Sequence, residues 1–401
     1  ITNQDVERFT RSAAIWSEIF EQQMDQYTQA ATFQHEIENP YICGMPLNKQ
    51  QEVFVGRTDI MARIEHLLTD PSRPPLHLYG QRRMGKTSLL LNLDHYLPSS
   101  IISVFLDSQA MAGFSRPEEL FTYILEEIFA EGFRQHGLKF PQVDFYDSTS
   151  SLFSKVRGWI DAAEKMLSAE NLILLVMLDE FEALESFTRL PTFNIKDFVG
   201  LSRFINQHRP HIKIMVVGSH TLDEIGSWST FLINTQVVKI GRLAKDEALR
   251  LILNPVKNYK LAYEPDASQR ILDLTSGHPH LVQSICYELV MLKNEQLPQK
   301  RFTAVLSDVD EAARRSLASI SFFFVDMRGS QINPGTAAML DYLADRGEGG
   351  RIAHSEWTER FPANFDQNLA LALKRDLVEQ VDGGYRFQIE MVRRWFEKRP
   401  F

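Results

Sequence analysis

The residues best suited to chemistry lie together between Gly80 and Ser88. Gly80, four intervening residues and then Gly85, Lys86 and Thr87 form the pattern G-x-x-x-x-G-K-[ST], which follows a short apolar run and opens an apolar helix. In such a loop the glycines let successive backbone N–H groups point at phosphate oxygens, and the helix N-terminus adds partial positive charge. The spacing therefore predicts a phosphate-binding loop; the alternative, a chance glycine-rich turn, does not explain the flanking strand and helix.

Each part of this loop has an expected role toward ATP or ADP and Mg²⁺. We expect Lys86 to reach the β- and γ-phosphates and the Thr87 hydroxyl to ligate the metal ion. The whole predicted phosphate cradle comprises Gly80, Gln81, Arg82, Arg83, Met84, Gly85, Lys86, Thr87 and Ser88.

A second group of reactive side chains follows the apolar run 172–178. Asp179 and Glu180 come directly after it, where ligands bind at the carboxyl edge of a parallel sheet. We expect Asp179 to hold Mg²⁺ through water and Glu180 to polarise the attacking water as general base. A helix N-cap is the alternative role for such acids, and Glu182 is expected to face solvent.

A third strand end supplies a candidate γ-phosphate sensor. The apolar run 212–217 ends in Gly218, Ser219 and His220. In P-loop ATPases with an additional strand, such a strand lies between the phosphate-loop strand and the strand that ends in the two acids. Ser219, taken as catalytic, or His220 would then face the γ-phosphate; a simple strand-to-turn transition is the alternative.

Apolar runs alternate with amphipathic helices along the chain, which is typical of an α/β fold. These runs lie at 101–106, 172–178, 212–217 and 236–240. We predict a P-loop NTPase core, a parallel sheet with helices on both faces. From Ala244 the pattern is helical, at 244–254, 266–276 and 279–293. Gly277 suits a left-handed C-cap and Pro279 a first helical turn.

The last seventy or so residues are predicted to form a winged helix-turn-helix. Helices are expected at about 335–345, 354–360 and 365–378, followed by a hairpin around Asp382-Gly383-Gly384 and a final helix. Residues 331–401 contain ten Lys or Arg and eleven Asp or Glu. Because a DNA-binding face normally has a basic excess, nucleic acid is a possible but disfavoured partner, and intramolecular packing is favoured.

The composition of the chain limits the classes of protein to which it can belong. The chain has 401 residues and a net charge of −9, so no overall basic field indicates nucleic acid. The two cysteines, Cys43 and Cys286, lie far apart and suit a reducing, cytoplasmic setting. No apolar run is long enough for a membrane span, and no repeat array is present. The chain begins with Ile1, so we expect a trimmed or processed chain with further domains possible at either end.

The predicted organisation has five parts. They are a helical linker or stalk (1–38), the P-loop core (39–242), a helical lid (243–300), a connector (301–330) and the winged helix (331–401). The first part shows apolar residues at helical spacing. It is either a stalk for oligomerisation or effector attachment, or a helix packed on the body.

With these residues in place, the chain resembles the STAND-class ATPases, an AAA+-related signalling clade, over roughly residues 39–400. The resemblance rests on Asn39-Pro40-Tyr41 with Gly44-Met45-Pro46, on Phe54-Val55-Gly56-Arg57, on Gly277-His278-Pro279 and on the trailing winged helix. It implies that Val55, Gly56 and Arg57 lie on the adenine side and that His278 and Pro279 contact the nucleotide from the lid.

Two departures from the family pattern are present. Thr58-Asp59 stands where the family often has Glu, and Ser219-His220 where its sensor is often Arg. The segment 221–238 contains no Arg for a finger supplied in trans, which favours a slow, self-contained switch over a ring motor. The resemblance implies an ATP-dependent signalling switch, a homo-oligomer in the ATP state, and an effector or sensor partner. The alternatives are a DNA-acting ATPase of the origin-recognition or transposition-regulator type, and a nucleotide-gated scaffold without hydrolysis.

Overall fold

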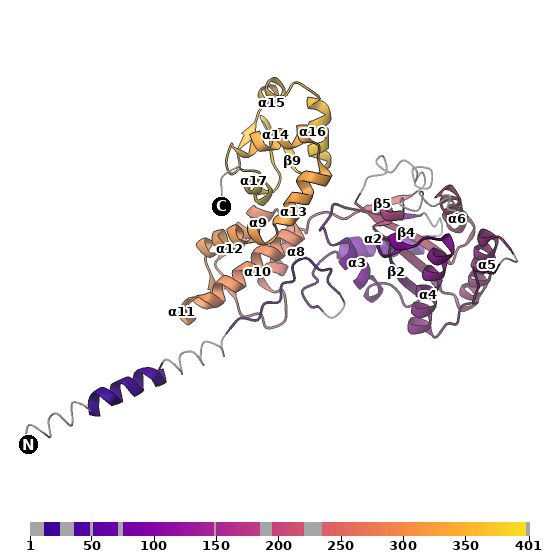
Figure 1. Ribbon diagram of the computed structural model, residues 1–401, viewed down its shortest axis with the longest axis horizontal. Helices are drawn as coiled ribbons and strands as arrows, with labels where there is room; N and C mark the ends of the chain where they lie inside the picture. The colour runs from indigo at the N-terminus through magenta and orange to yellow at the C-terminus, as the bar shows by residue number, and fades with distance from the viewer. Residues whose placement is uncertain are drawn as a thin grey trace, which may run out of the picture.

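A computed structural model describes residues 12–24, 36–48, 51–70, 75–147, 150–184, 195–219 and 235–397 (Figure 1). Among these residues no helix combines the length and the apolar character needed to cross a bilayer. His220 and most of the segment 221–238 lie outside the described residues.

The centre of the fold is a five-stranded parallel sheet in the order β2-β3-β4-β1-β5. The strands are β1 (Leu76–Tyr79), β2 (Ile101–Asp107), β3 (Ile173–Asp179), β4 (Ile212–Gly218) and β5 (Gln236–Lys239). Strand β4 lies between β1 and β3, as expected for the additional-strand class. All five strands therefore present their carboxyl ends at one edge.

Helices bury both faces of this sheet, as a parallel sheet requires. Alternate side chains of β2, β3 and β4 form one core with α4 (Pro117–His136), α5 (Leu152–Glu170) and α6 (Ile195–His208). The other side chains of β3 and β4 pack with α2 (Thr58–Thr69) and α3 (Lys86–Asn92). Short 3₁₀ turns η1 (Leu93–His95) and η2 (Ala110–Gly113) follow α3 and β2. The predicted α/β fold class is confirmed.

The chain then continues into a helical unit, residues 245–319. Its elements are α8 (Lys245–Leu253), β6 (Ala262–Tyr263), α9 (Pro265–Thr275), α10 (Pro279–Glu295), α11 (Pro298–Arg301), β7 (Thr303–Ala304) and α12 (Leu306–Ser319). A connector follows, with α13 (Ser321–Asp326) and the π-helical η6 (Met327–Gln331). In the connector Phe323 and Phe324 are buried, whereas Phe322 is 85% exposed.

The C-terminal unit spans residues 334–397. It consists of α14 (Pro334–Ala344), β8 (Arg351–Ile352), α15 (His354–Arg360), α16 (Phe365–Lys374), β9 (Val378–Val381), β10 (Gly384–Phe387) and α17 (Glu390–Phe396). The helices and the β9–β10 hairpin lie close to their predicted positions, except that α16 ends at Lys374 whereas the sequence predicted helix to residue 378, where β9 begins. Strand β8, which pairs with β10, was not predicted because two residues are too short for a detectable pattern.

One hydrophobic core joins the helical unit, the connector and the C-terminal unit. It includes Ile285 of α10, Phe324 of α13 and Val392 of α17, all of them fully or almost fully buried. Helix α17 packs against both α9 and α12. Moving the C-terminal unit away from the helical unit would expose this core to water at a cost of about 25 cal/mol for each Å² of apolar surface. The two units therefore behave mechanically as one body.

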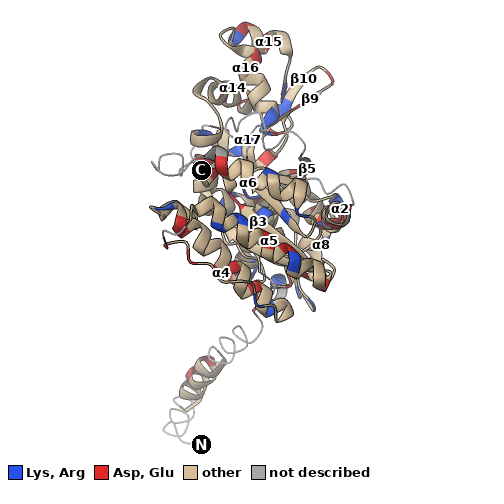
Figure 2. Ribbon diagram, turned by 90° about the vertical axis from the view of Figure 1, so that its right-hand side faces the viewer, with Lys and Arg blue, Asp and Glu red and all other residues tan. Residues whose placement is uncertain are grey.

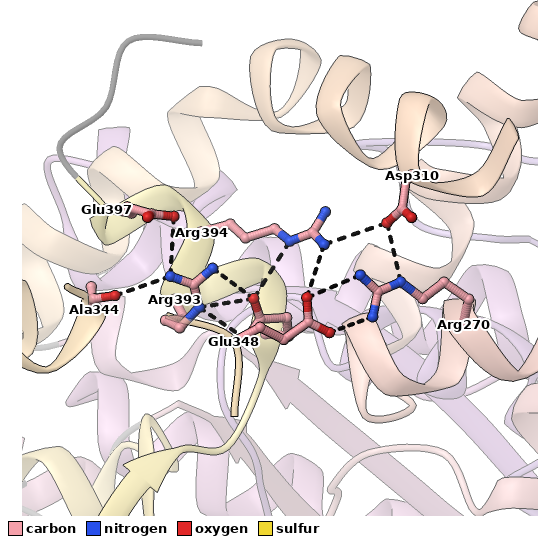
Figure 3. A network of polar contacts seen from close by, with 8 residues as sticks. Arg270, Asp310, Ala344, Glu348, Arg393, Arg394 and Glu397 are labelled. Carbon is pink, nitrogen blue, oxygen red and sulfur yellow. Dashed lines mark hydrogen bonds and ion pairs between the residues drawn. The ribbon is translucent and has the colours of Figure 1, made fainter. Parts of the chain in front are cut away.

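A network of ion pairs reinforces the same junction (Figure 3). Arg270 of α9 pairs with Asp310 of α12 at 3.1 Å and also with Glu348, which follows α14. Arg394 of α17 reaches Glu348 at 3.3 Å and Asp310 at 3.4 Å. Bonds from Arg270, and then from Arg394, lower the pKa of Glu348 to about 2. A shared network of this kind holds its geometry better than an isolated surface pair.

The N-terminal helix at residues 12–24 stands away from the body (Figure 1). Every one of these residues is exposed, including Trp16 at 60% and Phe20 at 64%. The described part of this helix is therefore not packed on the body, which was one of the two alternatives for it.

The junction between sheet and helical unit requires glycine at position 277. Gly277 has φ of +74°, and a Cβ there would lie 2.7 Å from the Leu243 carbonyl oxygen. We expect Gly277→Ala to destabilise the protein by roughly 1–3 kcal/mol, through backbone strain and this collision. Gly158→Ala, in the open middle of α5, is the control and should be neutral or stabilising. Thermal unfolding followed by circular dichroism measures the stability of both variants. Equal changes in stability would contradict the requirement for glycine at position 277.

Candidate functional site

The phosphate-binding loop is built by the turn from β1 into α3. Gly85 has φ of +86°, which lets the chain turn sharply into the helix. At Gly80 a Cβ would lie 2.5 Å from the Ile240 carbonyl oxygen, so only glycine fits. The Gly80 N–H donates to the Gly218 carbonyl at 3.2 Å, which ties the loop to the end of β4.

Lys86 lies folded back into this loop. Its ammonium donates to the carbonyls of Gly80 at 2.8 Å and Gln81 at 3.0 Å. Burial lowers the pKa of Lys86, while the nearby carboxylates of Glu180 and Asp179 oppose that shift. The cation is thus held inside the loop, in the place where it could contact phosphate oxygens.

Thr87 and Asp179 meet across the site. The Thr87 hydroxyl donates to Asp179 Oδ2 at 2.6 Å, although the two residues are far apart in sequence. Asp179 is only 3% exposed. Burial raises its pKa to about 6, against the opposing hydrogen bond from Thr87. A hydroxyl oxygen and a buried carboxylate placed together in this way are ligands that Mg²⁺ prefers, so these residues fit the predicted metal site.

Glu180 lies beside this pair in a strained conformation. Its φ is +48°, in the left-handed region that non-glycine residues rarely adopt. Its N–H donates to Asp179 Oδ1 at 3.0 Å, and the residue lines the same cavity as Lys86. Such strain is typical of functional sites.

Strand β4, which leads to the candidate sensor Ser219, makes a contact that the sequence did not predict. Glu182 accepts a hydrogen bond from the Ser219 N–H at 2.6 Å and is only partly exposed, so its expected solvent-facing position is wrong. Gly218 is packed against the same carboxylate, since a Cβ there would lie 2.3 Å from Glu182 Oε1. The sequence pattern missed this contact because Glu182 and Ser219 belong to different strand ends.

The cavity over the loop has a volume of about 590 Å³, within the usual range for a small-molecule site. Of the predicted site residues it is lined by Val55, Arg57, Arg82, Arg83, Met84, Gly85, Lys86, Thr87, Ser88, Asp179, Glu180 and Pro279. Gly56, Gly80, Gln81, Ser219 and His278 are not among its lining residues.

Arg57, expected on the adenine side, also connects three parts of the chain. Its N–H donates to Glu247 of α8 at 2.6 Å, and its guanidinium donates to the Met84 carbonyl at 2.9 Å and the Arg242 carbonyl at 3.3 Å. Burial lowers the pKa of Arg57, with Glu247 opposing the shift. Gly56 is needed here because a Cβ would collide with Glu247.

The lid motif enters the cavity through Pro279 and not through His278. The His278 ring is 2% exposed and packs edge-on against Phe323. Burial, followed by the neighbouring His280, lowers the pKa of His278 to about 3, so its ring is neutral. Pro279 occupies the first turn of α10 as predicted, and His280 also lines the cavity.

Residues from the C-terminal half contact the phosphate-binding loop directly. The Gln81 amide donates to the Arg375 carbonyl and to Asp376 Oδ2, the latter at 3.2 Å. Arg82 pairs with Asp326 of the connector at 3.0 Å. Sequence reasoning could not find these contacts, because no local pattern relates the loop to a segment more than 240 residues away.

Two solved structures share this architecture over almost the whole chain. A Walker-type ATPase of Pyrococcus abyssi superposes with a TM-score of 0.62 at 16% identity, covering 89% of this chain and 99% of that one. The chain shares the fold of this ATPase. The ORC2 protein of Aeropyrum pernix, in ADPNP–ADP complexes, has a TM-score of 0.51 at 15% identity, covering 90% of this chain and 96% of that one. No protein-family model and no curated protein sequence matches the chain.

Two cavity residues at the end of β2 were not anticipated as site residues. Asp107 and Gln109 line the cavity over the loop together with Asp179. A signal was present in the sequence, since Asp107 follows the apolar run 101–106 as Asp179 follows 172–178.

Burial of Asp179 predicts a pH-dependent stability. Its pKa of about 6 exceeds the roughly 3.9 of an unfolded chain, so its ionisation costs stability above pH 6, and this cost disappears toward pH 4. We expect Asp179→Asn to raise the melting temperature of the nucleotide-free protein at pH 8 by a few degrees, and by less at pH 5. Differential scanning fluorimetry measures this, with the exposed Asp382→Asn as control. The same shift at both pH values would contradict the electrostatic cause.

Proposed function

We propose that the protein is an ATP-binding, slowly hydrolysing signalling switch of the STAND type, whose nucleotide state controls oligomerisation or activation of an effector. The observation that carries this proposal is the Thr87–Asp179 contact, which brings the phosphate-binding loop and the acidic strand end to one cavity. The AAA+-related fold supports ATP as the ligand.

Each residue of the site has a role in this proposal. The backbone amides between Gly80 and Lys86 bind the phosphates, and the Lys86 ammonium exchanges its loop carbonyls for phosphate oxygens. Thr87 and Asp179 hold Mg²⁺, which neutralises charge on the β- and γ-phosphates when bound. Glu180 accepts a proton from the attacking water.

Two features of the chain around the expected position of the γ-phosphate support slow turnover. Ser219 does not line the cavity, and its N–H is taken by Glu182. The segment 221–238 contains no Arg, so the sequence offers no arginine finger there to stabilise transition-state charge in a neighbouring subunit.

In this proposal the protein switches when the C-terminal half separates from the phosphate-binding loop. The contacts in the closed arrangement, in which the two touch, must therefore be weak enough to break. The contacts of Gln81 and Arg82 with Asp376 and Asp326 are polar and partly exposed. The Arg82–Asp326 pair has side chains 45% and 38% exposed, and such pairs contribute only about 0–1 kcal/mol. ATP would open the molecule by binding the open form more tightly than the closed one.

A DNA-acting ATPase is the second candidate, because the ORC2 structure shares the fold. Against it, several arginines of the C-terminal unit form ion pairs within the protein. Arg346, Arg386 and Arg394 are paired with Glu356, Glu379 and Glu348. Acidic and basic positions are interspersed along the ribbon (Figure 2). Phosphate contacts would need these arginines to be available.

We further propose that the exposed helix at residues 12–24 serves oligomerisation or effector attachment. Its large apolar side chains, Ile15, Trp16, Ile19 and Phe20, are all more than 40% exposed. We place the switch in the cytoplasm, in keeping with the free thiols of Cys43 and Cys286.

Two variants separate nucleotide binding from hydrolysis. Lys86→Ala should weaken ATP binding at least tenfold, because it removes the cation that contacts phosphate. Glu180→Gln should retain binding and lower turnover at least a hundredfold, the usual contribution of a general base. Fluorescent-nucleotide titration and phosphate release measure the two effects. Normal binding by Lys86→Ala would refute the site, and unchanged turnover in Glu180→Gln would refute the role of that residue. Phosphate release by the wild type no faster than by Glu180→Gln would favour the non-hydrolysing scaffold.

A second experiment tests the contacts between the loop and the C-terminal half. We expect the double variant Asp326→Asn with Asp376→Asn to release bound ADP about 3–10 times faster, since it weakens two polar contacts of up to about 1 kcal/mol each. Stopped-flow displacement of a fluorescent ADP analogue measures the rate. Asp382→Asn, a change of the same type in the β9–β10 turn, is the matched control. An unchanged release rate in the double variant would show that these contacts do not restrain the nucleotide.

A further inference from the structure

Asp107 lies at the carboxyl end of β2, directly beside the acid expected to hold Mg²⁺. Strands β2 and β3 are parallel and in register, so that Asp107 is the partner of Asp179. Neighbouring strands lie about 4.8 Å apart. Both acids line the nucleotide cavity together with Lys86 and Thr87.

The position of Asp107 is fixed by the turn that follows it. Its Oδ1 accepts a hydrogen bond from the Gln109 N–H at 2.9 Å, and the Ser108 N–H donates to the Asp179 carbonyl at 3.1 Å. The turn after β2 is therefore attached to the end of β3. This arrangement holds the carboxylate of Asp107 next to that of Asp179.

Acidic side chains that could serve a divalent cation line the cavity. Asp107, Asp179 and Glu180 line it together with Thr87 and Lys86, and its lining as a whole also includes the basic residues Arg57, Arg82 and Arg83 and the acid Asp326. Among the described residues no three acidic, histidine or cysteine side chains converge closely enough to hold a metal ion by themselves. Mg²⁺ keeps several of its waters in protein sites, and carboxylates commonly bind those waters.

We propose that Asp107 is a third residue of the magnesium site, accepting hydrogen bonds from water in the ion's shell while Thr87 and Asp179 hold the ion. The proposal rests on the proposed nucleotide-binding function.

If Asp107 had a purely structural role, the substitution Asp107→Asn would give a different result. If the residue only shapes the turn, an amide oxygen would serve as well, because the Asn side chain can accept the same bond from the Gln109 N–H. Asp107→Asn therefore removes the charge and keeps the turn. If that variant did not fold, Asp107→Ser would retain an acceptor oxygen for the turn and remove the charge in the same way.

The test measures how strongly Mg²⁺ promotes nucleotide binding, apart from turnover. Affinity for a fluorescent ATP analogue is determined with Mg²⁺ and with EDTA, and the ratio of the two affinities is compared between variants. We expect Asp107→Asn to lower this ratio roughly three- to tenfold, with EDTA affinity unchanged, since a bond to a charged group is lost. Asp382→Asn should leave both affinities unchanged.

The outcomes distinguish this proposal from the proposed function. A wild-type ratio in Asp107→Asn, with nucleotide bound normally, would overturn the role of Asp107 and leave the ATP site intact. Equal losses with Mg²⁺ and with EDTA would also overturn it, because they would indicate a structural effect on the loop. Failure of the wild type to bind nucleotide would instead refute the proposed function itself.

Discussion

The site depends on one hydrogen bond between residues that the sequence keeps far apart, from the Thr87 hydroxyl to the Asp179 carboxylate at 2.6 Å. It forms because the sheet is parallel, which brings the loop after β1 and the carboxyl end of β3 to the same edge, on either side of β4. The first turn of α3 reaches the carboxyl end of β3 across the end of β4. The Gly80 N–H bonds to the Gly218 carbonyl of that inserted strand.

Charged groups are buried in this arrangement at a cost in free energy, and a bound ligand of opposite charge would reduce that cost. Burial raises the pKa of the Asp179 carboxyl, and burial also lowers the pKa of the Lys86 ammonium. Both shifts disfavour the charged forms that phosphate and metal binding need. A ligand that carries the opposite charges would therefore stabilise the site on binding.

Local patterns in the sequence were sufficient for much of this architecture. The phosphate-binding loop and the acidic strand end are each one continuous stretch of sequence, and a helix cap such as Pro279 acts within one turn. The positions of these features could therefore be predicted. Contacts between distant segments could not. Glu182 was expected in solvent but binds the Ser219 N–H, and the contact of the Gln81 side chain with the C-terminal unit had no local pattern to indicate it. Asp107 follows an apolar run as Asp179 does, but only the register of β2 with β3 shows that the two residues are neighbours.

The distribution of hydrophobic cores determines where this molecule can bend. The sheet has its own cores on its two faces, while another core runs through the helical, connector and C-terminal parts and includes Tyr41, Leu47 and Val53 from the segment before α2. Breaking that core costs free energy for every buried side chain, whereas Arg82–Asp326 and Gln81–Asp376 are polar contacts that water can replace. Among the contacts of the C-terminal half with the sheet domain, those that touch the phosphate-binding loop are therefore the easiest to break. A domain movement driven by the nucleotide would turn the helical and C-terminal units together about residues 240–244, with Gly277 and Arg57 lying beside that hinge.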